Sequence, residues 1–148
     1  MKHSEDLSVA IRQDKIEEVV KALMSGLNIN TKTKDGQSLL FIAVCAGSMD
    51  ITKLFLGRGA DVNIQNSFGR TILHQLVLEG YETMFKYLIK RPDLIVSSVD
   101  DFGKSILHTA AEWGRTSFLQ PLLDVCYSID VNPYISNTFG VSMAKTLK

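Results

Sequence analysis

Two histidines are the residues of this sequence best suited to acid–base chemistry. His74 and His108 each follow a hydroxyl residue, Thr71 or Ser105, at an interval of three residues. Histidine is the usual proton donor or acceptor near neutral pH. An acid–base role also needs a pocket with further perturbed acids or bases, and the sequence offers none beside them. Because the same pair recurs at the same place in successive segments, we interpret both histidines as structural.

A pair of neighbouring acids, Asp100-Asp101, could suggest a carboxylate site. No further acid lies nearby in sequence, so the pair lacks the two contrasting environments that separate a catalytic acid from a base. We expect a turn with a solvated tip. The sequence also lacks a phosphate-binding glycine loop, a metal motif and a nucleophile elbow. We therefore predict no enzyme activity and no catalytic, cofactor-binding or metal-binding residues.

The two cysteines, Cys45 and Cys126, lie in different segments, each within an apolar helical pattern. We expect reduced, partly buried thiols, which are typical of the cytosol or the nucleus. Neither cysteine has histidine partners at the spacing of a zinc site.

The composition indicates one globular domain without a nucleic-acid or membrane partner. The 148 residues are 45% hydrophobic and 22% charged, which allows a buried core. Sixteen basic residues balance sixteen acidic ones, whereas nucleic-acid and membrane-surface binders usually have an excess of basic residues. The polar N-terminus does not resemble a signal peptide, and no apolar run approaches the roughly 18 residues of a membrane span.

The glycines reveal an internal repeat. Gly36, Gly69 and Gly103 are separated by 33 and 34 residues, and a second series, at positions 47, 80 and 114, has the same intervals. Two glycine series in step at this period indicate a repeat protein.

Each unit has a turn glycine, a hydroxyl residue two positions later, an apolar helix that ends at a glycine, and a second helix. The second helix carries an apolar stripe at helical spacing. The stripes we predict are Ile16, Val19, Val20 and Leu23; Ile51, Leu54 and Phe55; Met84, Tyr87 and Leu88; and Phe118, Leu122 and Leu123.

These motifs resemble the ankyrin repeat family, whose pattern includes T-P-L-H and G-A-D-V-N. Residues 59–63, Gly-Ala-Asp-Val-Asn, match the second motif fully, and residues 71–74 and 105–108 match the first with isoleucine in place of proline. The resemblance implies an all-α fold, an ankyrin-repeat solenoid of stacked helix-turn-helix units with β-turn or hairpin tips. It also implies that His74 and His108 bond the hydroxyl and backbone of their turns, and that Asp100 bonds turn backbone.

We expect a single domain, residues 1–148, with approximate repeats at 1–32, 33–65, 66–99 and 100–136 and a partial repeat at 137–148. The first repeat is degenerate, and its polar positions suit the outer face of a cap. These positions are Arg12, Gln13, Lys15, Glu17, Glu18 and Lys21.

The C-terminal part departs from this regular period. The interval from Gly103 to Gly140 is 37 residues, so the fourth repeat has extra residues, around either Val125–Ser128 or Pro133–Ser136. The final segment, Val141–Lys148, is either a minimal cap or the cut end of a longer protein.

A repeat fold without a catalytic constellation favours a protein-interaction module that acts as a monomer without a cofactor. The resemblance implies binding through the concave face and the turn tips, where aromatic and arginine side chains dominate interface energetics. The candidate residues for partner binding are Trp113, Phe102, Phe68, Tyr81, Arg115, Glu112, Asp101, Glu79, Phe139 and Lys34. The alternatives are that each phenylalanine packs on its own hairpin and that Trp113 packs against Tyr81 or Leu78.

Narrower roles stay open at this point. One is a stand-alone inhibitor similar to the IκB-like proteins, which bind Rel-type transcription factors and are in some cases viral. Another is a targeting or scaffold segment of a larger signalling protein or enzyme. An inhibitor similar to those of cyclin-dependent kinases ranks lower, because the unit from Gly36 to Asn63 is regular.

Overall fold

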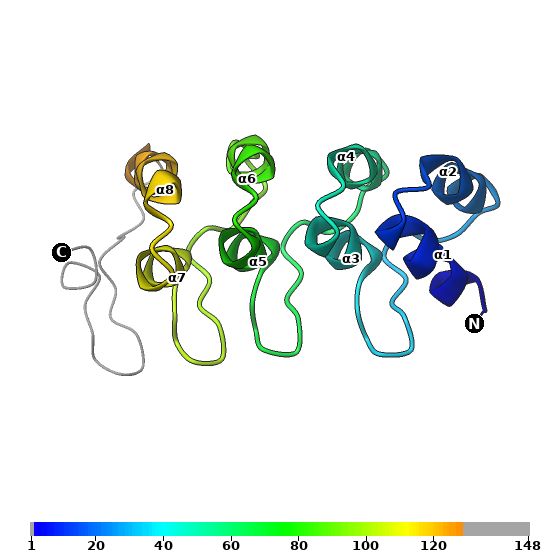
Figure 1. Cartoon of the computed structure of the whole chain (residues 1–148), viewed down its shortest axis with the longest axis horizontal. Helices are drawn as coiled ribbons and strands as arrows, with labels where there is room; N and C mark the ends of the chain where they lie inside the picture. Colours follow the sequence, from blue (N-terminus) through cyan, green and yellow to red (C-terminus); the bar gives the residue numbers. More distant parts are fainter. Residues whose placement is uncertain (1, 129–148) are drawn as a thin grey trace. The chain divides into compact units, whose positions relative to one another are not determined.

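The computed structural model describes residues 2–128, and it describes the side chains of residues 7–126. The chain divides into two compact units at the boundary between Ile64 and Gln65. We call them unit 1 and unit 2. The described residues contain eight helices, four in each unit. Within each unit the helices lie in two layers, the first helix of each pair in one layer and the second in the other (Figure 1).

Unit 1 consists of α1 (Lys2–Arg12), α2 (Ile16–Met24), α3 (Leu39–Cys45) and α4 (Met49–Gly57). Helix α1 packs on both α2 and α3, and α4 packs on both α3 and α2. The exposed side chains of the first repeat include all six polar positions that we assigned to a cap face.

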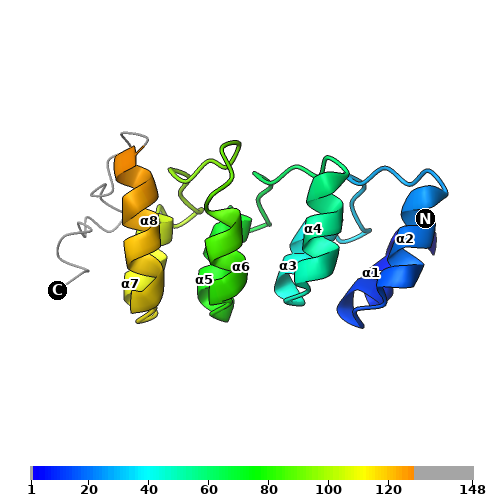
Figure 2. The same cartoon turned by 90° about the horizontal axis from the view of Figure 1, so that it is seen from above.

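Unit 2 repeats this arrangement with α5 (Ile72–Glu79), α6 (Glu82–Leu88), α7 (Ile106–Glu112) and α8 (Thr116–Ser128). Helices α5 and α7 pack side by side, as do α6 and α8 (Figure 2). Helix α8 has 13 residues where α6 has 7. Part of the extra length of the fourth repeat therefore lies at Val125–Ser128, and the other candidate segment, Pro133–Ser136, is outside the described residues.

Hydroxyl residues begin the first helices, as the repeated motif predicts. Ser38, Thr71 and Ser105 are the N-caps of α3, α5 and α7, and the oxygen of each accepts a hydrogen bond from the backbone N–H three residues later. Such caps satisfy an otherwise unpaired helix donor and are worth about 1 kcal/mol each. Gly80 ends α5 in the left-handed conformation, with φ of 76°, where a Cβ is unfavourable.

Hairpin tips precede the first helices. Isolated antiparallel bridges join Lys32 to Ser38, Gln65 to Thr71, and Val99 to Ser105. The tips lie in the loops that extend from the layer of first helices, on the side away from the second helices (Figure 1). The expected all-α fold of paired helices with hairpin tips is therefore confirmed.

The core lies between the two layers of each unit, and it corrects part of the predicted stripes. In α6 the buried residues are Met84, Phe85 and Leu88, whereas Tyr87 is 40% exposed. Phe85 is buried because its ring meets Phe118 of α8 edge to face, with centroids 4.8 Å apart. In α2 the predicted Ile16 is also exposed, since it is the first residue of the helix.

Candidate functional site

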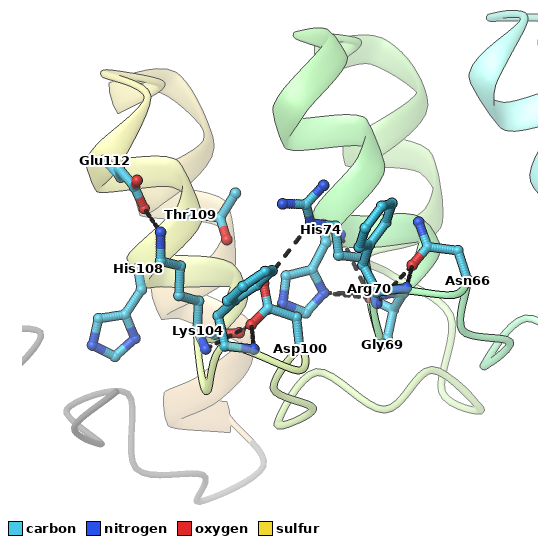
Figure 3. Close-up of polar contacts among 12 residues, drawn as sticks. Asn66, Gly69, Arg70, His74, Asp100, Lys104, His108, Thr109 and Glu112 are labelled. Atoms are coloured by element: carbon cyan, nitrogen blue, oxygen red, sulfur yellow. Dashed lines mark hydrogen bonds and ion pairs between the residues drawn. The ribbon is translucent and has the colours of Figure 1, made fainter. Parts of the chain in front are cut away.

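His74 is a structural bridge between two neighbouring repeats of unit 2. The backbone N–H of Thr71 donates to Nδ1 of His74 at 3.2 Å, and the Thr71 hydroxyl oxygen lies 2.9 Å from the same nitrogen. On the other side of the ring, Nε2 lies 3.0 Å from the carbonyl oxygen of Lys104 (Figure 3). Because a carbonyl can only accept, the proton of the neutral ring is on Nε2, and Nδ1 is the acceptor.

Burial keeps this ring neutral. The side chain of His74 has no exposed surface. Burial lowers the pKa of His74 below its ordinary value, and this effect outweighs the opposing effects of the Lys104 carbonyl and the Asp100 carboxylate. A ring without exposed surface, with both nitrogens bonded, cannot reach a substrate. The structural interpretation of His74 is confirmed.

His108 occupies the same place one repeat later. The backbone N–H of Ser105 donates to Nδ1 of His108 at 3.4 Å, and the Ser105 hydroxyl lies 2.7 Å from that nitrogen. The His108 backbone N–H donates back to the hydroxyl oxygen at 3.2 Å. The side chain is 2% exposed. His108 therefore closes a capping box as His74 does, which confirms its structural role.

The acidic pair contains one buried and one exposed residue, so the expectation of a solvated tip is wrong for Asp100. Its Oδ1 accepts hydrogen bonds of 2.9 Å from the backbone N–H groups of Phe102 and Lys104. Its Oδ2 lies 3.8 Å from Nε of Arg70. A carboxylate can be buried when charge-assisted hydrogen bonds replace its water. Asp101 alone is exposed.

The tips of the two repeats in unit 2 are joined closely. The backbone N–H of Asp101 donates to the carbonyl oxygen of Phe68 at 2.9 Å. Gly69 has φ of 72°, and a Cβ there would lie 2.9 Å from the backbone nitrogen of Asp101 and would also meet its carboxylate. Only glycine therefore permits both the turn and this approach.

Arg115 joins the same two repeats at the opposite end of the first helices. Its Nε donates to the carbonyl oxygen of Val77 and its Nη2 to that of Leu78, each at 3.2 Å. Both carbonyls belong to the last turn of α5, whose C-terminal partial negative charge favours a cation, and the Val77 carbonyl also accepts from the backbone N–H of Gly80 at 3.3 Å. The guanidinium packs over Gly80. Arg115 is half-buried and acts as a tie between repeats, a role that sequence analysis did not identify.

Three aromatic side chains at the hairpin tips and at the end of α7 in unit 2 are exposed. Trp113 is 58% exposed, Phe68 is 52% and Phe102 is 46%. Phe68 lies under the guanidinium of Arg70 from its own hairpin, with 5.4 Å between the guanidinium carbon and the ring centroid. More than half of Trp113 is therefore available to solvent, and packing within the hairpin covers about half of Phe68.

A salt bridge places the hairpin and the end of α7 on one side of unit 2. Nζ of Lys104, next to the turn glycine, lies 2.6 Å from Oε2 of Glu112, in the last turn of α7 (Figure 3). Sequence analysis missed Lys104 and Arg70. A basic residue directly after the turn glycine in two successive repeats was the available signal.

The other candidate residues fall into three groups. Glu79, at the end of α5, is exposed like Asp101 and Glu112, and Tyr81, the N-cap of α6, is half-buried. Lys34 is exposed at the tip in unit 1. Phe139 lies outside the described residues.

Within residues 2–128, no cluster of three His, Cys, Asp or Glu side chains could hold a metal ion. Within the same range, every helix is too short or too polar to cross a membrane.

Comparison with known proteins identifies the repeat. The family described as ankyrin repeats (3 copies) matches residues 7–95 and 47–135. The human transient receptor potential cation channel subfamily A member 1 is 33% identical over 111 residues, covering 70% of this chain and 10% of the channel. A putative ankyrin repeat protein of Rickettsia bellii is 28% identical over 144 residues, or 96% of this chain and 20% of that protein.

A third relative, human SH3 and multiple ankyrin repeat domains protein 2, is 29% identical over 118 residues, covering 79% of this chain and 6% of that protein. The chain thus spans a fifth or less of the length of these three relatives.

Proposed function

Because the chain belongs to the ankyrin repeat family, we propose that it is a non-catalytic module that binds another protein through exposed side chains of unit 2. We define the unit-2 surface as Phe68, Glu79, Asp101, Phe102, Glu112 and Trp113. The exposure of Trp113, Phe68 and Phe102 on one rigid framework is the observation that carries the proposal. Aromatic side chains of this kind are the usual hot spots of interfaces, each worth about 2 kcal/mol or more.

The framework around these side chains supports the proposal because it is preorganised. Successive repeats of unit 2 are joined at the tip, at His74 and at Arg115. No buried polar side-chain atom of the described residues lacks a hydrogen-bond partner. A surface held this way loses little conformational freedom on binding, which favours affinity.

Among the narrower roles, we favour a module within a larger signalling protein over a separate inhibitor of Rel-type factors. The three relatives described above carry the matching segment as a small part of much longer chains. The described residues hold no disulfide between Cys45 and Cys126, which supports a reducing location, in the cytosol or nucleus.

The test compares capture of proteins from cell lysate by three versions of the full chain: wild type, a Trp113→Ala/Phe102→Ala variant and a Tyr87→Ala variant. Tyr87 is an exposed aromatic residue of α6, outside the unit-2 surface. Circular dichroism first establishes that all three are folded. We expect a partner retained by wild type and Tyr87→Ala and lost by the double variant. Equal retention by all three would contradict the proposal.

A further inference from the structure

We propose that the partner of the unit-2 surface presents a basic segment, in which an apolar or aromatic side chain is flanked by arginine or lysine. This inference rests on the proposed function and specifies the chemistry of the partner. It follows from a difference in unit 2 between the cations, which already contact groups of the protein, and the exposed carboxylates, which are only partly paired.

The three cations around the unit-2 surface are all engaged. Arg70 lies beside the buried carboxylate of Asp100 and over the ring of Phe68. Lys104 pairs with Glu112. Arg115 donates to the carbonyl oxygens at the end of α5. Each of them already makes a polar contact within unit 2, which favours the protein's own groups over an acidic partner.

The carboxylates of the unit-2 surface are not all paired with cations. Glu79 and Asp101 are both exposed, and within the described residues neither forms an ion pair with a lysine or arginine. The contact recorded for the Glu79 carboxylate is with the neutral amide of Gln75, at 2.9 Å. Glu112 shares Lys104 but keeps half of its side chain exposed. The unit-2 surface therefore carries an excess of negative charge.

The protein already contains one instance of the recognition that we propose. The Arg70 guanidinium lies against the Phe68 ring on one side and the Asp100 carboxylate on the other. Phe102 is next to Asp101, and Trp113 is next to Glu112. Each of these places therefore combines an exposed aromatic residue with an exposed carboxylate residue, the two groups that Arg70 contacts. Cations over Trp or Phe contribute about 0.5–2 kcal/mol each.

Charge also distinguishes a basic segment from two other possible partners of this surface, an acidic segment and a second copy of the chain. An acidic segment would face Asp101, Glu79 and Glu112 with like charges, which costs affinity. A second copy of the chain would present the same negative excess to itself, so self-association through this surface is disfavoured.

The experiment selects phage-displayed random dodecapeptides on the full-length wild-type chain, with subtraction on the Trp113→Ala/Phe102→Ala variant. We expect the enriched peptides to combine arginine or lysine with an apolar residue. The affinities of synthetic versions are then measured by fluorescence of Trp113, the single tryptophan of the chain. We expect binding to weaken as salt rises, since the screening length falls from about 10 Å at 0.1 M to about 3 Å at 1 M.

A matched pair of charge variants tests the carboxylates directly. Glu79→Gln/Asp101→Asn removes two charges from the unit-2 surface, and Glu17→Gln/Asp50→Asn removes two exposed charges from unit 1. We expect the first variant to weaken binding about tenfold at low salt and the second to change it less than twofold.

Four outcomes would overturn the inference. Peptides that need Trp113 and Phe102 but show no excess of basic residues, or equal binding by both charge variants, would do so while leaving the proposed function intact. Concentration-dependent dimerisation of the wild type in sedimentation velocity, abolished by Trp113→Ala, would assign the surface to a second copy. Failure to enrich any peptide over the double variant would count against the proposed function as well.

Discussion

The residue three positions after the N-cap of the first helix differs between the two units. In unit 2 it is His74, which reaches the Lys104 carbonyl of the next repeat, and Arg115 of that repeat reaches the end of α5. In unit 1 the residue equivalent to His74 is Phe41, which is 8% exposed and follows the N-cap Ser38 at the same interval. An apolar contact tolerates small shifts, whereas a buried donor must meet its acceptor within a few tenths of an ångström. The polar contacts of His74 and Arg115 therefore hold the two repeats of unit 2 at a defined spacing.

Unit 1 has polar contacts between its repeats, but they lie elsewhere. The Ser48 hydroxyl donates to Oδ1 of Asp14 at 2.5 Å, and the backbone N–H of Asp61 donates to Oδ1 of Asn30 at 3.0 Å. Both contacts involve residues outside the first helices. The same position of the repeat motif therefore accepts either a buried phenylalanine or a buried, hydrogen-bonded histidine, and four predictions follow from the difference.

The largest effect is expected from replacing the bridging histidine. His74→Phe removes the bond to Lys104 and leaves the buried backbone N–H of Thr71 without its acceptor, at a cost of about 2–3 kcal/mol. The change in unit 1 to compare is Phe41→Leu, which alters only packing and should cost about 1 kcal/mol. Urea denaturation of the full chain measures both free energies of unfolding. Equal losses would mean that the polar contact of His74 is no more demanding than the apolar packing of Phe41.

The next largest loss of stability is expected from alanine substitutions of the turn glycines, and it should differ between the two units. Gly36 has φ of 77° and open space around a Cβ, so Gly36→Ala should cost about 1 kcal/mol from backbone strain alone. Gly69→Ala adds a collision with Asp101 to the same strain and should cost about 2 kcal/mol or more. The difference between the two midpoints of denaturation reports the close contact between tips in unit 2. Identical midpoints would show that the tips separate without cost.

A pH dependence should accompany the polar contact of His74. Because burial lowers the pKa of His74 in the folded state, the unfolded chain binds the proton more readily. Stability is then greatest above the ordinary histidine pKa of about 6.5 and falls as pH decreases below it, by at most about 1.4 kcal/mol per pH unit from this residue. The free energy of unfolding of wild type, measured from pH 7.5 to pH 5, should fall more steeply than that of His74→Phe. Parallel slopes would exclude His74 as the source.

The smallest effect on stability is expected at the unit-2 surface itself. Trp113 and Phe102 are exposed, so the Trp113→Ala/Phe102→Ala variant should unfold within about 0.5 kcal/mol of wild type per substitution. Denaturation curves check this directly. A larger loss would indicate that these rings support the fold, which would weaken their assignment to a partner.

Much of the architecture could be predicted from local patterns. The glycine intervals, the hydroxyl N-caps and the hydroxyl–histidine pairs are short-range features, and the structure confirms the elements that they predicted. The choice of buried residues within a helix was less predictable. Phe85 and Tyr87 both fit an apolar stripe in α6, and contact with Phe118 in the next repeat decides that Phe85 is the buried one.

The candidate site was predicted only in part. Exposed aromatic residues beside the glycines were recognisable by their register, and Trp113, Phe68 and Phe102 are indeed exposed. The burial of Asp100 and the inward role of Arg115 were not recognisable. The bonds of Asp100 to the backbone of its own turn were implied by the resemblance, but its contact with Arg70 and the bonds of Arg115 to α5 depend on distances to the neighbouring repeat, which a sequence does not state.

The sequence by itself determined the repeat, its period, the paired helices and the turns that begin them, because helix caps and left-handed glycines act over a few residues. Only the tertiary structure decided which polar residues form hydrogen bonds or ion pairs within the protein and which remain available to a partner. Arg70, Lys104 and Arg115 carry the same charge as any other exposed cation in the sequence, but folding places each against a carboxylate or a carbonyl of unit 2. Asp101 and Glu79 remain exposed without such a cation, because electrostatic pairing depends on distance in space rather than on position along the chain.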